Sequence, residues 1–276
     1  MAIVAFWKSG EKEAGQTVSM IATATVMAIE HNYKILAIST GFRDRAIEES
    51  FFEPTKVNIF NADANKGNMQ SGIEGLSRII QSNRGGSNIV PNYTKVVFRD
   101  RFDILPSPLT SEYKDYIQMS KNYISLMDLA KNDYNLVFVD IDKRLPAEVQ
   151  KALLDKADVI VLNANQSVKH LEKLTELKAK SALFQKQNIV ILLGRYDKYS
   201  KYNMKNMYRL LKKEKLAAVP YNTQFFEATT EGKVADYFLK CKTVTMKTDR
   251  NVLFMDEVNK TCDTILSKIQ EVQMRR

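Results

Sequence analysis

Continuous apolar runs alternate with amphipathic stretches along this chain, and the alternation predicts its elements. Buried strands are expected at residues 2–6, 33–39, 134–140, 157–162 and 188–193, and shorter ones at 96–98, 102–105 and 216–220. Apolar residues at helical spacing predict helices over 18–30, 72–81, 111–131 and 256–273, and residues 82–94 read as a loop. Strands that are apolar on both faces belong in a parallel sheet covered on both sides. We therefore predict an α/β fold with a single doubly wound, mostly parallel sheet flanked by helices.

Composition narrows the class of protein without choosing a function. The chain has 276 residues, of which 45% are hydrophobic, enough for the core of one large domain. No apolar run is long enough to span a membrane and no signal-peptide pattern precedes the first strand, so we expect a cytoplasmic protein. Cys241 and Cys262 lack metal-site spacing and read as buried thiols, and His31 and His170 as helix-surface residues. The formal net charge of +9 indicates anionic partners: nucleic acid, acidic lipid or an acidic protein.

The loop after the first predicted strand has the spacing of a phosphate-binding loop. It matches G-x-x-x-x-G-K-[ST], except that Gln16 stands where the lysine belongs. Backbone N–H groups in such a loop can hold phosphate oxygens, and Thr17 can reach Mg²⁺. The candidate nucleotide-binding residues here are Gly10, Glu11, Lys12, Glu13, Ala14, Gly15, Gln16 and Thr17. The spacing predicts a P-loop NTPase fold that lacks the positive charge between the β- and γ-phosphates.

Polar residues also follow three later strands, at the edge of an open α/β sheet where ligands bind. Asp140 and Asp142 end the strongest strand pattern, and Asp140 has the place of a Walker B carboxylate that binds Mg²⁺ together with Thr17. The alternative interpretation is an aspartate that caps the next helix or a solvated strand end. Arg195 and Pro220 follow two other strands and are candidate nucleotide-binding residues. We assign no catalytic residue.

The order and spacing of these motifs resemble the ParA/MinD superfamily of deviant Walker A P-loop ATPases over nearly the whole chain. Beyond the loop, the segments that match family motifs are residues 34–41, 134–140, 157–162, 193–195, 219–222 and 227–232. The resemblance implies one P-loop domain over residues 1–276 that binds ATP or ADP with Mg²⁺. It also implies a homodimer whose subunits meet over their P-loops.

Four departures from the family pattern bear on hydrolysis. Glu11 and Gln16 occupy the positions of the family's two loop lysines. Ser39 and Gly41 stand where the family has aspartates after its second strand, and Gly194 stands where it has an adenine-binding asparagine. Asp44 follows nearby, but the sequence does not settle its register. Because each missing group supplies charge, water positioning or base selection, we expect weak ATP hydrolysis or none.

Two further segments each allow two interpretations. The lysines, arginines and tyrosines of residues 198–215 suit non-specific DNA binding, as in ParA-type relatives. We prefer the alternative interpretation, a solvated helix whose buried side would hold Tyr202, Met204, Met207, Leu210 and Leu211. The apolar face of residues 256–273 indicates a final helix packed on the core, or a membrane-binding helix as in MinD-like relatives.

Three functions remain open. The leading hypothesis is a dimeric ParA/MinD-like protein with weak or absent hydrolysis that positions or helps assemble a cellular machine. A pilus or secretion apparatus would be its protein cargo, as for the TadZ/CpaE branch, at the inner face of the membrane or at a pole. The alternatives are a plasmid or chromosome partition ATPase that binds DNA through residues 198–215, and an interaction scaffold that binds no nucleotide.

Overall fold

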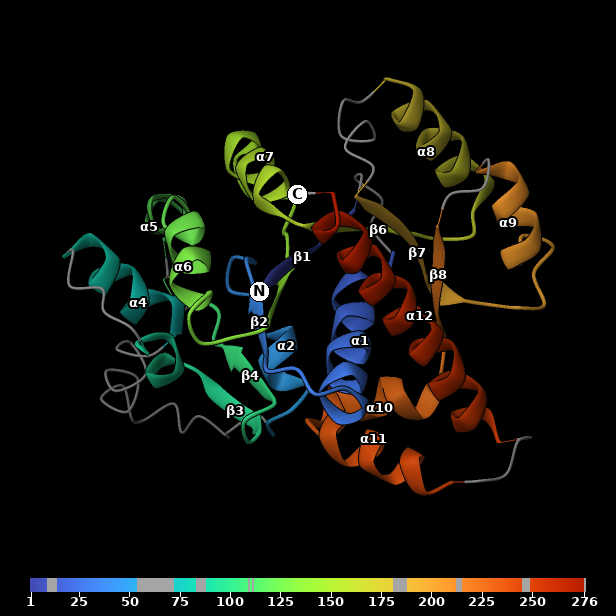
Figure 1. The fold of residues 1–276 in the computed structure, drawn as a ribbon, viewed down its shortest axis with the longest axis horizontal. Coiled ribbons are helices and arrows are strands. Elements are labelled where there is room, and N and C mark those ends of the chain that lie inside the picture. The colour runs from blue at the N-terminus through green and yellow to red at the C-terminus, as the bar shows by residue number, and fades with distance from the viewer. Residues whose placement is uncertain are drawn as a thin grey trace.

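A mostly parallel sheet forms the centre of the molecule (Figure 1). The structure is a computed structural model and describes residues 1–8, 14–53, 72–82, 88–108, 110, 112–180, 188–211, 215–244 and 249–275. Within these ranges the sheet has the order β3-β4-β2-β5-β1-β6-β7-β8. The strands are β1 (Ala2–Trp7), β2 (Ile35–Ser39), β3 (Lys95–Phe98), β4 (Phe102–Leu105), β5 (Leu136–Asp140), β6 (Val159–Ala164), β7 (Ile189–Tyr196) and β8 (Leu216–Pro220). All neighbours pair in parallel except β3 with β4, which confirms the predicted fold class.

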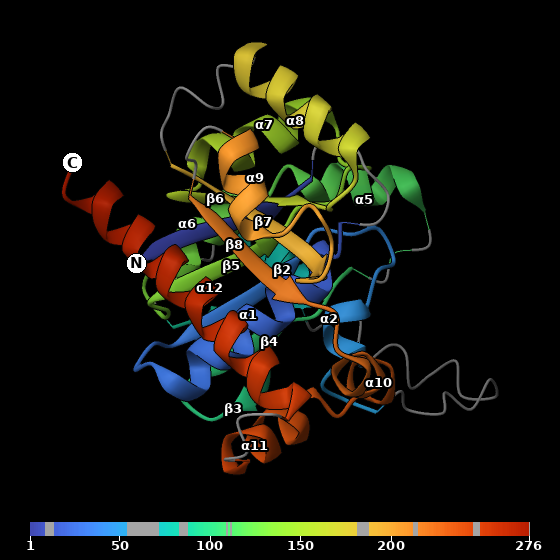
Figure 2. The same cartoon turned by 90° about the vertical axis from the view of Figure 1, so that its right-hand side faces the viewer.

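Helices cover both faces of the sheet, so that Figure 2 shows the strands between two helical layers. One layer consists of α1 (Gln16–Glu30), α2 (Ala46–Glu49), α10 (Thr223–Glu231), α11 (Val234–Thr243) and α12 (Arg250–Gln273). The other consists of α4 (Gly72–Gln81), the 3₁₀ helix η1 (Val90–Tyr93), α5 (Tyr113–Ser120), α6 (Tyr123–Ala130), α7 (Ala147–Lys156), α8 (Val168–Lys180) and α9 (Met204–Leu210). The two layers explain why the central strands are apolar on both faces.

Strand β1 lies in the middle of this arrangement and carries the first loop. It pairs with β5 on one side and β6 on the other, and side chains of Val4 and Phe6 enter one core while Ile3 and Ala5 enter the other. Because the carboxyl ends of β1, β5 and β2 lie at the same edge, the segments that follow them meet there. The register of the sheet therefore assembles the candidate site.

The helix predicted over residues 111–131 is wrong in one respect, because the chain forms two helices there. The break follows Ser120, whose hydroxyl donates to the carbonyl of Ile117. The N–H of Asn122 then bonds to the carbonyl of Met119, three residues back, so the ladder tightens and restarts. Buried Tyr116 and Tyr123 are seven residues apart, close to two full turns, which is why the periodicity indicated a single helix.

The last helix begins earlier than predicted. Asp249 caps α12 by accepting a hydrogen bond from the N–H of Asn251, so the helix starts at Arg250 rather than Asp256. Its face is buried through Val258, Cys262 and Ile265, as the core-packing interpretation predicted. Within the described residues, no helix is both long enough and apolar enough to cross a bilayer.

The structure also bears on the predictions for the two cysteines, for His170 and for residues 82–94. Both cysteines are buried thiols, as expected. The expectation for His170 is wrong: its side chain is buried, because it lies one turn before buried Leu174 on the inner side of α8. The loop expected at residues 82–94 contains the short helix η1, and residues 83–87 lie outside the described part of the chain.

Candidate functional site

The connection from β1 to α1 is the first component of the site. Of the eight predicted loop residues, Ala14 to Thr17 are described, whereas Gly10, Glu11, Lys12 and Glu13 lie outside the described residues. Gly15 has φ +62°, a left-handed backbone conformation that is strained for residues with a side chain. Its carbonyl accepts the first hydrogen bond of the helix, from the N–H of Ser19. The loop therefore places the N-terminus of α1, where backbone N–H groups have no partner within the helix, at the carboxyl edge of the sheet.

The end of β7 packs directly against this loop. A Cβ atom on Gly194 would lie 2.1 Å from the carbonyl oxygen of Ala14, so any larger residue would collide with backbone. The next residue, Arg195, has φ +52°, and its Cγ would lie 3.5 Å from a Cβ on Gly15. Packing therefore requires a glycine at position 194.

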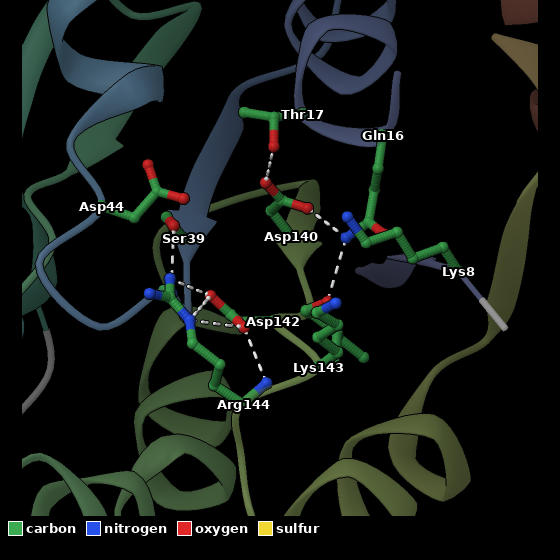
Figure 3. A pocket seen from close by; sticks show the side chains of 11 residues that line it. Lys8, Gln16, Thr17, Ser39, Asp44, Asp140, Asp142, Lys143 and Arg144 are labelled. Carbon is green, nitrogen blue, oxygen red and sulfur yellow. Dashed lines mark hydrogen bonds and ion pairs between the residues drawn. The ribbon is translucent and has the colours of Figure 1, made fainter. Parts of the chain in front are cut away.

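Thr17 and Asp140 lie together, as predicted for a magnesium site. Asp140 ends β5 with its side chain turned toward α1, and its Oδ2 accepts a hydrogen bond of 2.5 Å from the hydroxyl of Thr17 (Figure 3). Burial raises the pKa of Asp140 from 3.8 to about 6, and the hydrogen bonds from Thr17 and Gln16 oppose that rise. The carboxylate is therefore a buried acid that a cation would stabilise in its charged form.

Gln16 fills the space beside this carboxylate. Its side-chain nitrogen donates to Asp140 Oδ1 and also lies 3.1 Å from the carbonyl oxygen of Phe6 and 3.0 Å from that of Ile141. An amide has two hydrogens for these three acceptors, whereas an ammonium has three. The Oε1 atom of Gln16 is buried and has no hydrogen-bond partner among the described residues. The surroundings of residue 16 therefore suit a lysine better than the glutamine that occupies it.

A cavity of about 310 Å³ opens in front of these residues. Its lining comprises Lys8, Gln16, Thr17, Ser39, Gly41, Asp44, Asp140, Ile141, Asp142, Lys143 and Arg144. Asp44, whose register the sequence left open, lines this cavity together with Ser39 and Gly41. Three carboxylates and three cations face the same space, so this is a strongly polar cavity; we refer to it as the phosphate-side cavity. Lys8, Lys143 and Arg144 were not predicted, although each follows a strand by a few residues, as the predicted candidates do.

A second cavity of about 320 Å³ lies on the other side of Gly15, and we refer to it as the base-side cavity. Its lining comprises Gly15, Val18, Ser19, Arg195, Val219, Pro220, Tyr221, Asn222, Phe225 and Phe226. The predicted residues Arg195 and Pro220 therefore lie in one cavity with Gly15. Tyr221 and Phe226 stand at its mouth with ring centroids 6.4 Å apart, and both are about half exposed. Aromatic and apolar walls of this kind suit a flat ring system.

The basic segment at residues 198–215 lies apart from both cavities. Helix α9 buries Met207, while Lys198, Lys201, Lys205 and Arg209 are exposed. The predicted buried side is right for Met207 and Leu211 and wrong for Leu210, which is 50% exposed. Residues 212–214 lie outside the described chain, so the prediction for the two lysines there stays open.

Comparison with known proteins gives a match of fold. No protein-family model and no curated protein matches the chain. The ParA family ATPase from Chlorobium tepidum TLS superposes with a TM-score of 0.67 at 17% identity, covering 98% of this chain and 97% of that chain. MinD from Pyrococcus horikoshii OT3, complexed with Mg-ADP, gives 0.63 at 16% identity over 97% and 98%. A putative plasmid partition protein from Borrelia burgdorferi B31, bound to AMPPNP, gives 0.62 at 16% identity over 97% and 99%.

These superpositions confirm the predicted resemblance to the ParA/MinD superfamily. They span nearly all of each chain, so the order of the elements is shared from end to end. At identities below 20% the likeness establishes the fold, and the chemistry of the site has to be argued from this chain's own residues.

Proposed function

We propose that this protein binds ATP or ADP with Mg²⁺ in a single P-loop domain and hydrolyses it weakly or not at all. In this proposal it forms a homodimer and positions or helps assemble a cellular machine, such as a pilus or secretion apparatus. The observation that carries the proposal is the contact between Thr17 and Asp140 at the start of α1, in the wall of the polar cavity.

The residues present fit a magnesium nucleotide in three places. Thr17 and Asp140 offer the oxygen ligands that Mg²⁺ prefers, and phosphate and water oxygens would complete its coordination. The N-terminus of α1 provides N–H groups for phosphate oxygens. The base-side cavity, with Arg195 and Pro220, has room for the base. Bound Mg²⁺ would supply charge neutralisation of the phosphates.

Weak hydrolysis follows from what the polar residues of the phosphate-side cavity can do. Gln16 is neutral and its amide is engaged by Asp140, so it supplies no positive charge to a phosphate. Loss of one such group typically costs about 3 kcal/mol of transition-state stabilisation, a factor of hundreds in rate. Asp44 is the carboxylate of this cavity that remains to orient water after β2. Binding with slow turnover is therefore the expected behaviour.

Isothermal titration calorimetry of the full chain with Mg-ATP and with Mg-ADP tests the proposal. We expect saturable binding of both, nucleotide-dependent dimerisation in analytical ultracentrifugation, and little phosphate release over hours. Absence of binding to either nucleotide would contradict the proposal and favour an interaction scaffold that binds no nucleotide. Rapid phosphate release would contradict the part that concerns hydrolysis.

A second candidate function is DNA partition through residues 198–215. It is supported by the exposed cations of α9 and the loop before it, beside Tyr199, which is 86% exposed, and Tyr208. Binding of this kind weakens steeply as salt rises, because it releases counterions from DNA. A filter-binding assay at 50 and 200 mM salt separates the two functions, since a protein-positioning role requires no retention of DNA at either concentration.

A further inference from the structure

Positive charge in the phosphate-side cavity comes from positions other than the one that a P-loop normally uses. Residue 16 is a glutamine, whereas Lys8, Lys143 and Arg144 all line the same space. Of these, Arg144 is the cation whose hydrogen bonds fix its guanidinium at the wall of the cavity. The segment after β5 can therefore supply positive charge that residue 16, in the loop after β1, does not supply.

Arg144 is held by a two-pronged interaction with Asp142. Its Nε lies 2.9 Å and its Nη2 2.5 Å from Asp142 Oδ2, and its backbone N–H donates to Oδ1 of the same carboxylate at 2.7 Å. The side chain is 47% exposed, so it faces both the cavity and water. Among the described residues, no hydrogen-bond partner is found for the remaining nitrogen, Nη1. A guanidinium fork of this kind matches phosphate oxygens as well as carboxylate oxygens.

The backbone beneath Arg144 is tied to the end of β5. The N–H of Asp142 donates to the hydroxyl of Thr40 at 2.8 Å, and that hydroxyl donates to the carbonyl of Asp140 at 2.9 Å. The hydroxyl of Tyr116 donates in turn to the carbonyl of Thr40 at 2.6 Å. These bonds connect three segments and hold the backbone before Arg144 in place, close to the predicted magnesium ligand Asp140.

The strand order places Arg144 at the far end of a bound nucleotide. The base-side cavity belongs to β7 and β8, α1 follows β1, and Arg144 follows β5, on the side of β1 away from β7. A nucleotide with its base beside Pro220 and its phosphates along the start of α1 extends toward β5 and β2. In this arrangement Lys8, which follows β1, would lie next to the inner phosphates and Arg144 next to the outermost one.

We propose that Arg144 binds the terminal phosphate of a nucleoside triphosphate and so lets this site distinguish a triphosphate from a diphosphate. The inference rests on the proposed function, because it requires that nucleotide occupies the two cavities. The positive charge then comes from the segment after β5 instead of from residue 16. On binding, the guanidinium would share its donors between Asp142 and the phosphate.

The test is the affinity of the full chain for Mg-AMPPNP and Mg-ADP, measured by calorimetry for the unaltered protein and for Arg144→Gln. We expect Arg144→Gln to weaken Mg-AMPPNP binding about tenfold or more and Mg-ADP binding less than twofold, because a charged hydrogen bond to the third phosphate is lost. Arg99→Gln is the matched control: Arg99 is 95% exposed and lies at the β3–β4 turn, beside the amino end of β4. We expect both affinities of that variant to be unchanged.

A double variant, Asp142→Asn with Arg144→Gln, separates a direct contact from an effect of net charge. Removing Arg144 alone leaves Asp142 without its partner near the phosphates, and this repulsion would also weaken binding. If Arg144 donates to the phosphate, the double variant stays as weak for Mg-AMPPNP as the single one. Restored affinity in the double variant overturns the inference.

The outcomes also separate this inference from the proposed function. Binding of both nucleotides by the unaltered protein, with equal losses or none in Arg144→Gln, overturns the role of Arg144 and leaves nucleotide binding intact. No binding by the unaltered protein overturns both. Thermal unfolding of each variant within a few degrees of the unaltered protein shows that a changed affinity does not come from misfolding.

Discussion

The two cavities that flank Gly15 are alike in size and opposite in character. In the phosphate-side cavity the polar groups bind one another, as Gln16 and Thr17 bind Asp140 and as Arg144 binds Asp142. In the base-side cavity the walls are mostly aromatic and apolar, with Ser19, Arg195 and Asn222 as the polar side chains. A ligand must therefore exchange existing hydrogen bonds on one side, whereas it gains by covering apolar surface on the other. Three of the positions that depart from the predicted motifs, Gln16, Ser39 and Gly41, line the polar cavity.

The largest expected effect comes from the close contact between the end of β7 and the loop before α1. Gly194→Ala forces a methyl group into the carbonyl of Ala14, and we expect the free energy of unfolding to fall by about 3 kcal/mol or more. Gly15→Ala is the comparison variant, because it has room for the methyl group and suffers only from its positive φ, at about 1–2 kcal/mol. Urea denaturation of both variants measures the difference. Equal losses would show that the close approach of β7 does not shape the loop.

Asp140→Asn probes the polar cavity through its pH dependence. The pKa of Asp140 is raised from 3.8 to about 6 in the folded protein, so between pH 4 and 6 the unfolded chain loses this proton first and stability falls as pH rises. At about 1.4 kcal/mol per pKa unit, the ionised carboxylate costs about 3 kcal/mol at pH 7. We expect Asp140→Asn to be more stable at pH 7 by up to this amount and to bind no Mg²⁺. Urea denaturation at pH 4, 5, 6 and 7 measures this, and a slope between pH 4 and 6 as steep as in the unaltered protein would exclude Asp140 as its source.

Gln16→Lys tests whether the polar cavity still accepts a P-loop lysine. An ammonium at this position meets three acceptors, from Phe6, Asp140 and Ile141, and lowers the pKa of Asp140 by its charge. We expect Mg-ATP to bind about tenfold more tightly and the variant to be about 1 kcal/mol more stable at pH 7. Gln16→Met is the matched control, with similar length and no charge, and calorimetry compares the three proteins. Equal affinities of Gln16→Lys and Gln16→Met would mean that the cavity no longer uses this charge.

The smallest effect is expected in the aromatic cavity. Phe226→Ala removes one ring at the mouth while Tyr221 remains, so we expect nucleotide affinity to fall by about fivefold, as for the loss of one stacking contact. Inorganic triphosphate, which has no base, should bind both proteins equally well. Leu239→Ala on α11 is an exposed control that leaves the cavity untouched. Weaker triphosphate binding by Phe226→Ala would show that the two cavities do not divide the ligand as proposed.

Most of the fold could be predicted because buried strands have a strong and simple signal. The continuous apolar runs at residues 2–6 and 134–140 predicted the two strands at the centre of the sheet. Thr17, Asp140, Arg195 and Pro220 were then predicted from their places after strands. The failures have local causes: one hydroxyl of Ser120 interrupts a helix whose periodicity continues across the break, and the cap at Asp249 precedes any apolar repeat.

The rest of the site depends on contacts between segments far apart in sequence. Nothing near Gly194 in the sequence indicates that Ala14 presses against it. The position of Asp44 depends on a turn in which Arg43 has φ +53°, and that of Arg144 on its fork with Asp142. Local patterns predict which strand end a residue follows; they do not predict which side chains turn into a shared space.

The buried thiol of Cys262 can report on the separation of α12 from α1. Its sulfur lies 3.6 Å from the carbonyl of Thr23, where α12 packs on α1, and burial raises the pKa of the thiol well above its usual range. A protonated, covered thiol reacts with maleimides or disulfide reagents only after the last helix has lifted away from the first. Its labelling rate therefore records how often that happens, and a ligand that clamps the amino end of α1 should slow the rate without touching the cysteine.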